Sequence, residues 1–292
     1  MTQQRGTLFS EISGKLDTVF RPPATLEDKV VLSNISHGGH VGTRAPGIGI
    51  KYVARGTEYY TIGGRTHAVR AGHFLCVPQS LPSEVEVRRT GEPTLGLCIF
   101  LRAEGEATEA AEPLEAPLIF PAGCSALGTL LEKNTADLMR PAADRAGIAA
   151  ALVQVARGNL EILLEDAGRE LASLGKLKKS TRYETLRRLA TARGYLHQVT
   201  DRPVELAELA AVAGLSRFHL LRHFRDCYGA PPGAYHRQLR LRLAKHAIDE
   251  QRLTCGDAAQ RYGFADGSSL SHAHRRAFGQ APVRSLSPDC AG

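Results

Sequence analysis

The stretch ELAELAAVAGLSRFHLLRHFRDCYG, residues 205–229, has the spacing of two short helices joined by a tight turn. Ala210 is followed four residues later by Gly214, and apolar residues recur after it. A small residue at the alanine position lets two helices approach closely, and glycine accepts a turn conformation that is costly for other residues. Ser216 is suited to cap the second helix, because its hydroxyl can accept a hydrogen bond from a backbone amide. The stretch therefore predicts a helix-turn-helix unit.

The same pattern returns at CGDAAQRYGFADGSSLSHAHRRAFG, residues 255–279. Ala259 and Gly263 are again four residues apart, and the turn after them is one residue longer. Between the two stretches, residues 231–251 begin with two prolines, which the first turn of a helix tolerates, and predict a single helix. Its expected apolar face contains Leu239, Leu243, Ala247 and Ile248. The sequence thus predicts two helix-turn-helix units joined by one helix.

The positive charge of the chain is confined to this C-terminal region. Residues 1–180 contain 20 Lys or Arg and 20 Asp or Glu, whereas residues 181–292 contain 17 basic and 10 acidic residues. The net charge of +7 therefore lies in the C-terminal part alone. Of those 17 basic residues 16 are arginine, whose planar guanidinium matches phosphate and guanine better than an ammonium does. This favours a nucleic acid as partner over a merely soluble basic domain.

The stretch SSLSHAHRRAFGQAP, residues 268–282, could be a metal site, a hydrolase remnant or a surface that binds polyanions. His272 and His274 are two positions apart, so a helix separates them by about 200° and they cannot both ligate one metal from one face. No G-x-S-x-G motif accompanies the serines. We therefore interpret the stretch as a second recognition helix, in which Leu270, His274 and Phe278 face inward.

At these residues the sequence resembles the AraC/XylS family of bacterial transcription regulators. The resemblance covers residues 185–286, and GLSRFHLLRHFRDCYGAPPGAYHRQLRLRLA and AAQRYGFADGSSLSHAHRRAFGQAP form its core. Further upstream, IKYVARGTEYYTIGGRTHAVRAGHFLCVP resembles the cupin-type sensing domain of many such regulators. The resemblance implies a DNA-binding protein that reads promoter sites on double-stranded DNA, responds to a small molecule and works with RNA polymerase.

In the first unit, the family's base-facing positions correspond to Phe218, Leu221 and Arg222, and Arg217 and Arg225 correspond to positions near phosphates. Arg222 is the best candidate for reading a base, since its guanidinium can pair with guanine O6 and N7. The two apolar residues can contact only thymine methyl groups or sugars.

In the second unit, the matching base-facing positions are Ser268, Ser271 and His272, with Arg275 and Arg276 directed to the DNA backbone. Serines give permissive base contacts, so we expect much of the affinity to come from phosphates and to fall steeply with salt. The linking helix should hold the two recognition helices about 34 Å apart, in two successive major grooves. Arg240 and Arg242 make its outer face basic, and the sequence leaves open whether they contact DNA or only solvent.

The N-terminal half predicts strands and then helices, so we expect an α+β fold. Short apolar segments separated by Gly and Pro indicate a cupin-like antiparallel β-barrel: GIGIKYV (47–53), EYYTIGGRTHAV (58–69), AGHFLCVP (71–78), SEVEV (83–87) and TLGLCIF (94–100). Residues 126–140 and 144–174 then have helical periodicity. The stripe on the longer helix contains Leu160, Leu163, Leu164, Ala167, Leu171 and Leu174. It fits a helix packed on its own barrel and a dimerisation helix equally well.

We therefore divide the chain into a sensing domain (1–118), a helical dimerisation and linker region (119–175) and an all-α DNA-binding domain (176–292). The polar, basic stretch 175–182 should be the linker between the last two. Six widely spaced cysteines, with no C-x-x-C pair, suit a reducing compartment. We expect no signal peptide and no membrane span, and hence a cytoplasmic protein.

The barrel lacks the His-x-His motif and later histidine of metal-binding cupins. We therefore expect neither a metal nor another cofactor, but a small organic effector bound inside the barrel. The polar and aromatic candidates for the pocket are Tyr52, Glu58, Tyr60 and His73. The alternatives are a cupin-type metalloenzyme with an accessory helical nucleic-acid-binding domain, and a helical module that binds RNA or an acidic protein.

The expected function is a ligand-responsive, homodimeric transcription regulator, an activator by the family's tendency, and not an enzyme. Effector binding should change how residues 120–175 pair or dock, and so bias which DNA half-sites the dimer spans.

Overall fold

A computed structural model describes residues 7–16, 27–44, 47–77, 82–89, 91–102, 117–141, 143–250 and 252–282. The chain forms two compact units, residues 1–190 and 191–292. The expected domain boundaries after residues 118 and 175 stay predictions.

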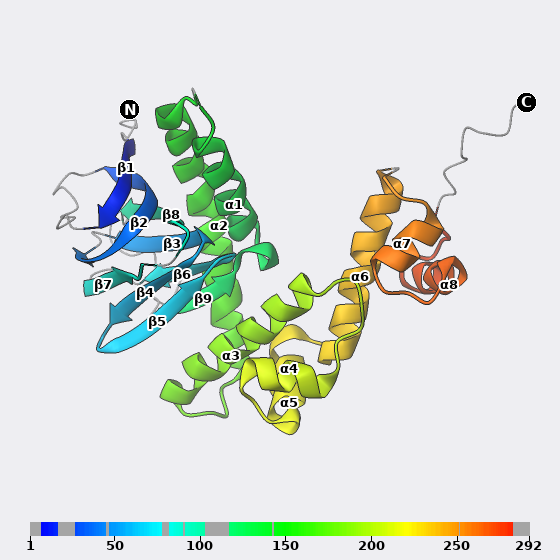
Figure 1. Cartoon of the computed structure of the whole chain (residues 1–292). Helices are drawn as coiled ribbons and strands as arrows, with labels where there is room; N and C mark the ends of the chain where they lie inside the picture. Colours follow the sequence, from blue (N-terminus) through cyan, green and yellow to red (C-terminus); the bar gives the residue numbers. More distant parts are fainter. Residues whose placement is uncertain are drawn as a thin grey trace, which may run out of the picture. The chain divides into compact units, whose positions relative to one another are not determined.

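The N-terminal unit contains one curved sheet (Figure 1). Its strands are β1 (Thr7–Leu16), β2 (Asp28–Arg44), β3 (Gly47–Arg55), β4 (Thr57–Ile62), β5 (Arg65–Arg70), β6 (His73–Val77), β7 (Pro82–Val87), β8 (Thr94–Arg102) and β9 (Leu118–Pro121). The order is β5-β4-β7-β2-β8-β3-β6-β9, with β1 paired in parallel to β2 and all other pairs antiparallel. The predicted hairpin turn between β4 and β5 is present, and both of its central residues, Gly63 and Gly64, have positive φ, of 56° and 75°. The α+β fold with an antiparallel, barrel-like sheet is confirmed.

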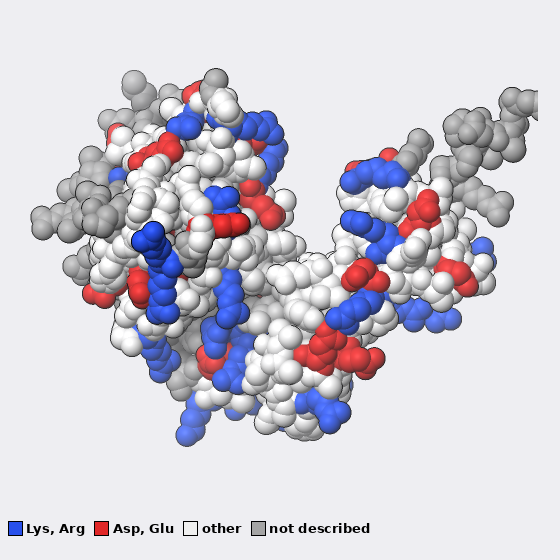
Figure 2. All heavy atoms as spheres, in the orientation of Figure 1, with Lys and Arg blue, Asp and Glu red and all other residues white. Residues whose placement is uncertain are grey.

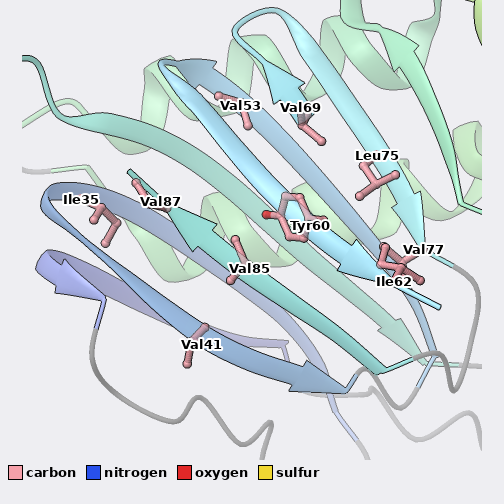
Figure 3. Packing of buried hydrophobic residues seen from close by; sticks show 10 residues of the cluster. All are labelled: Ile35, Val41, Val53, Tyr60, Ile62, Val69, Leu75, Val77, Val85 and Val87. Carbon is pink, nitrogen blue, oxygen red and sulfur yellow. The ribbon is translucent and has the colours of Figure 1, made fainter. Parts of the chain in front are cut away.

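The interior of the sheet is lined by branched aliphatic side chains around one tyrosine. Burial alternates strictly along β4, so that Glu58, Tyr60 and Ile62 point inward. Figure 3 shows Tyr60 among aliphatic side chains of other strands, including Val53 of β3, Val69 of β5 and Val85 of β7. The barrel core therefore consists of residues that sequence alternation places on one face.

Helices α1 (Ala126–Leu138) and α2 (Arg145–Ser173) follow a short 3-10 turn, η1 (Ala122–Cys124). α2 packs against α1 and against β1, β2 and β8. Its predicted stripe is buried at four of six positions and half-buried at Leu164 and Leu171. Arg157 anchors the helix through a salt bridge to the buried Asp28, with 2.8 Å between Nη2 and Oδ2. The stripe is thus buried within the protein, and α2 meets both α1 and the sheet, which favours the interpretation of a helix packed on its own barrel.

Helix α2 is not buried on all sides. Val155 and Ile162 are 52% and 59% exposed on the face away from the sheet. By length and composition alone, α2 is long and apolar enough to cross a membrane, and a third of that apolar window is buried inside the protein. Length and composition of this kind are shared by core helices.

The remaining helices are α3 (Lys179–Gln198), α4 (Leu206–Ala213), α5 (Arg217–Tyr228), α6 (Pro232–Asp249), α7 (Cys255–Arg261) and α8 (Gly267–Phe278). α4–α5 and α7–α8 are the two helix-turn-helix units, at opposite ends of α6 (Figure 1). The expected linker 175–182 is shorter than predicted, because α3 already begins at Lys179. Arg182 folds this segment into a turn by donating to the carbonyl oxygens of Leu177 and Gly175, each at 2.9 Å.

Candidate nucleic-acid interface

Each predicted helix-turn-helix turn contains its glycine in the left-handed region. Gly214 has φ of 63° and Gly263 has φ of 65°. At Gly263 a side chain is also excluded by space, because a Cβ atom would lie 2.4 Å from the carbonyl oxygen of Asp201. The predicted glycine role in both turns is confirmed.

Helix α5 is fixed at its start by a cap and along its length by two core residues. The hydroxyl of Ser216 accepts a hydrogen bond from the amide of His219 at 3.2 Å, as predicted. Leu220 and Phe224 are fully buried, which sets the rotation of the helix about its axis. The side chains half a turn away must then face solvent.

That solvent face brings all five predicted DNA-contacting residues of the first unit together. Phe218 and Leu221 are 68% and 44% exposed, although both are large apolar side chains. Arg217, Arg222 and Arg225 are exposed beside them. The outer face of α5 therefore combines two large apolar side chains with three arginines.

Helix α8 is arranged in the same way. Asp266 caps it, with its carboxylate accepting from the amide of Ser269 at 2.6 Å, and the pKa of this carboxyl is lowered chiefly by that hydrogen bond. Leu270 is fully buried and His274 is 2% exposed. The Nδ1–H of His274 donates to the carbonyl oxygen of Gln280 at 2.7 Å. The inward position predicted for His274 is confirmed.

The outer face of α8 gathers four of the five predicted residues of the second unit. Ser268, His272, Arg275 and Arg276 are exposed. Ser271 is only half-exposed, because its hydroxyl lies 3.4 Å from the thiol sulfur of Cys255 on α7. Ser271 is therefore turned toward the neighbouring helix and is the least available of the set.

The linking helix α6 corrects the sequence interpretation at Arg240. This side chain is only 6% exposed, and its Nη1 donates to the carbonyl oxygens of Tyr262 and Gly263 at 2.9 and 2.8 Å. Its guanidinium also lies 5.3 Å from the ring centre of Phe264. Arg240 therefore belongs neither to a DNA-facing nor to a solvated surface, and it fastens α6 to the turn of the second unit.

A periodic signal for Arg240 was present in the sequence. His236, Ala244 and Ile248 are buried and share its face of the helix at intervals of four residues. The imidazole Nε2–H of His236 donates to the carbonyl oxygen of Val199 at 2.7 Å. Two residues further on, Arg242 is exposed, as the basic outer face predicts. Figure 2 shows basic side chains interspersed with acidic ones over the visible face of this unit.

The barrel contains a second candidate site, a cavity of about 50 Å³. It is lined by Ile12, Val31, Ser33, Ile35, Val41, Lys51, Glu58, Tyr60, Val85, Val87, Cys98 and Phe100. Glu58 and Tyr60 were predicted pocket residues, and the phenol of Tyr60 donates to the carboxylate of Glu58. Lys51, Ser33 and Cys98 were not predicted.

Two predicted pocket residues do not line this cavity. Strand alternation turns Lys51 into the barrel and Tyr52 to the other face, which α1 covers. Burial there, together with the nearby Glu132, raises the pKa of Tyr52 to about 12. His73 begins β6 and lies half-buried, with its Nδ1 3.1 Å from the carbonyl oxygen of Ala71. Among the residues that the structure describes, no group of three His, Cys, Asp or Glu side chains is placed to hold a metal ion.

Known proteins resemble part of the chain. A family model described as a helix-turn-helix domain matches residues 209–286. A probable transcriptional regulator, LumQ of Photobacterium leiognathi, is 36% identical over 90 residues, which cover 31% of this chain and 36% of that protein. The right origin-binding protein of Escherichia coli K12 is 35% identical over 83 residues, which cover 28% of this chain and 29% of that protein. The chain thus spans only about a third of the length of these curated relatives.

A solved structure also resembles part of the chain. It is a transcriptional regulator of Chromobacterium violaceum, described as one of the AraC-type DNA-binding domain-containing proteins. It is 25% identical, with a TM-score of 0.32, and the similarity covers 33% of this chain and 87% of that one.

Proposed function

We propose that the C-terminal region of this chain, which a helix-turn-helix family model matches, is a double helix-turn-helix domain of the AraC/XylS type, and that the protein is a sequence-specific, DNA-binding transcription regulator. One observation carries the proposal. The second helix of each unit, α5 and α8, has a fully buried core residue on one face and a row of exposed, mostly polar or basic side chains on the other. A helix held in this way can enter a major groove with its outer face on the base edges.

The two recognition helices would read DNA unequally. On α5, Arg222 would pair with a guanine, and the exposed Phe218 and Leu221 would contact thymine methyl groups beside it. On α8, the exposed hydroxyl of Ser268 and the imidazole of His272 give weaker discrimination. We therefore propose one specific and one permissive half of each site, in two successive major grooves.

The barrel would bind a small organic effector in its cavity and transmit the binding to α2. This helix packs on β1, β2 and β8, and the same strands contribute Ile12, Ser33 and Cys98 to the cavity wall. A ligand that displaces these strands would displace α2 with them. The binding energy available for such a shift is the difference in effector affinity between the two arrangements.

α2 also supplies the surface proposed for a homodimer. Val155 and Ile162 lie seven residues apart on its exposed face, with the exposed Gly158 between them. A Cβ atom at Gly158 would meet no other atom within 4 Å, so a second helix has room to approach. Sedimentation of the full chain with and without effector measures the association. A cytoplasmic location, contact with RNA polymerase and activation rather than repression complete the proposal.

The test is selection of genomic DNA fragments by the full chain at about 150 mM salt, near physiological ionic strength. Fragments that share two boxes about one helical turn apart are the expected result. Competition with random duplex and with RNA is run in parallel. Binding that shows no sequence enrichment and disappears in salt, or that RNA competes away equally, would refute a sequence-specific regulator.

A further inference from the structure

The polar groups of the barrel cavity are brought together by strand register. Lys51 of β3 stands opposite Cys98 of β8, which in turn stands opposite Val31 of β2. In the next row, Ser33 and Val53 flank Gly96. The polar side chains thus come from separate strands that converge on one region of an otherwise apolar wall.

Gly96 makes room for the carboxylate of Glu58. A Cβ atom at Gly96 would lie 2.5 Å from Oε1 of Glu58 and 2.8 Å from the hydroxyl oxygen of Ser33. The carboxylate therefore occupies the space that a side chain on β8 would fill. Tyr60 donates to it, and Ser33 donates to the carbonyl oxygen of Gly96 at 3.2 Å. The glycine is a requirement of this cluster rather than of the strand.

Lys51 places a cationic group in the same cavity. The side chain is 3% exposed, as is that of Glu58, and its Nζ lies 3.6 Å from the ring centre of Phe100. Burial lowers the pKa of Lys51 and raises the pKa of Glu58. The cluster thus contains one basic and one acidic side chain, whose charges sum to zero when both are ionised and also when the proton has passed from Lys51 to Glu58.

This balance restricts what can share the cavity. An anionic ligand would gain attraction from Lys51 and meet repulsion from Glu58, and a cationic ligand would meet the reverse. Either ion would also lose its hydration without a surplus charge to compensate for it. An uncharged group that both donates and accepts hydrogen bonds loses least, because the cluster offers both kinds of partner.

We propose that the barrel cavity binds a small uncharged molecule with a short apolar body and one polar head, the head held by Lys51, Glu58 and Tyr60. This inference rests on the proposed effector role of the barrel. A cavity of about 50 Å³ holds roughly three to five non-hydrogen atoms, because one water needs about 10–15 Å³. Short primary amides and alcohols have this size and chemistry.

The test compares three compounds of nearly equal shape, propionamide, propionate and propylamine, by calorimetric titration of the full chain at neutral pH. We expect propionamide to bind at least about tenfold more tightly than either ion, given the cost of burying an unpaired charge. Equal or tighter binding of propionate or propylamine would overturn the proposal. So would the failure of all three compounds to bind at millimolar concentration.

Variants locate the binding. Glu58→Gln leaves Lys51 unopposed and should shift the preference toward propionate by about tenfold. The double variant Lys51→Met/Glu58→Gln buries no charge at these two positions, so it can replace the single variant in the titrations if Glu58→Gln does not fold. It should lose propionamide affinity at least about tenfold, since the head loses its charged hydrogen-bond partners. Glu84→Gln, a change of the same kind at an exposed site on β7, should change nothing.

Retention of wild-type affinity by the folded double variant would place the ligand elsewhere and refute the assignment. DNA binding is measured on the same preparations. Sequence-specific DNA binding without ligand binding would support the proposed regulator and refute the proposed ligand class. Ligand binding without DNA binding would support the proposed ligand class and refute the DNA-binding regulator.

Discussion

Removal of the Arg240 guanidinium should loosen the second helix-turn-helix unit without touching its recognition face. Arg240→Ala leaves the carbonyl oxygens of Tyr262 and Gly263 without their donor. A buried acceptor left unpaired costs about 1–3 kcal/mol. Both carbonyls belong to half-buried residues, so we take the lower part of that range for each. The contact with the ring of Phe264 adds about 0.5–1 kcal/mol. The expected loss is therefore about 3 kcal/mol.

Hydrogen exchange of the full chain, followed by mass spectrometry, measures this locally. Amides of α7 and α8 should exchange roughly 100-fold faster in Arg240→Ala, since about 1.4 kcal/mol corresponds to a factor of ten. Arg242→Ala removes an exposed arginine two residues away on the same helix. Its effect should stay within about 0.5 kcal/mol. Equal exchange in the two variants would show that Arg240 does not fasten the unit.

DNA binding provides an independent readout of the same variant. If Arg240 contacted a phosphate, Arg240→Ala would reduce the salt dependence of binding by about one counterion and leave amide exchange unchanged. The buried geometry predicts the converse, an unchanged salt slope with faster exchange. An altered slope at unaltered exchange would contradict the assignment.

The remaining predictions concern the readout, a turn and pH. Arg222→Ala should weaken discrimination at one base position by about 1–3 kcal/mol, measured by binding to a set of point-mutated DNA sites. The control variant Arg140→Ala, in the N-terminal unit, should leave DNA binding unchanged. A uniform loss of affinity over all sites would make Arg222 a phosphate contact. Gly263→Ala should lower the free energy of unfolding by about 1–3 kcal/mol more than Gly229→Ala, measured by thermal unfolding. Both glycines have positive φ, but only at Gly263 would a Cβ atom lie against a backbone oxygen. Similar losses in the two variants would contradict the steric argument. The pKa of Glu184 is lowered from its ordinary 4.5 to about 2, chiefly by a hydrogen bond from a neighbouring arginine, so its stabilisation is present above pH 4.5 and lost as the pH falls toward 2. Glu184→Gln should therefore cost about 0.5–1 kcal/mol at pH 7, after allowance for solvent screening, and nothing near pH 2; a pH-independent difference would contradict this.

Features that depend on neighbours in the chain could be predicted from sequence. Both turns of the C-terminal domain contain glycine at positive φ, and the hydroxyl of Ser216 caps α5, because each requirement is met within a few residues. The inward position of His274 followed from helical spacing relative to Leu270. Local geometry therefore also placed the exposed faces of α5 and α8.

Features that depend on what covers an element could not be predicted. In β3, residues 49–53 are all buried, because the barrel interior covers one face and α1 the other. Alternation between buried and exposed residues is then lost, and nothing local distinguishes Lys51 from Tyr52 as the residue facing the cavity.

The sequence by itself determined the two helix-turn-helix units, the sheet followed by helices, and the location of the positive charge. Only the tertiary structure decided that the stripe of α2 is buried within its own unit, that Arg240 donates to the turn of the second helix-turn-helix unit, and that Lys51 and Glu58 line one cavity. Periodicity and capping are properties of one segment, whereas burial is a property of the segments that meet there. Charges on separate strands can be seen to balance only once the strands are in register.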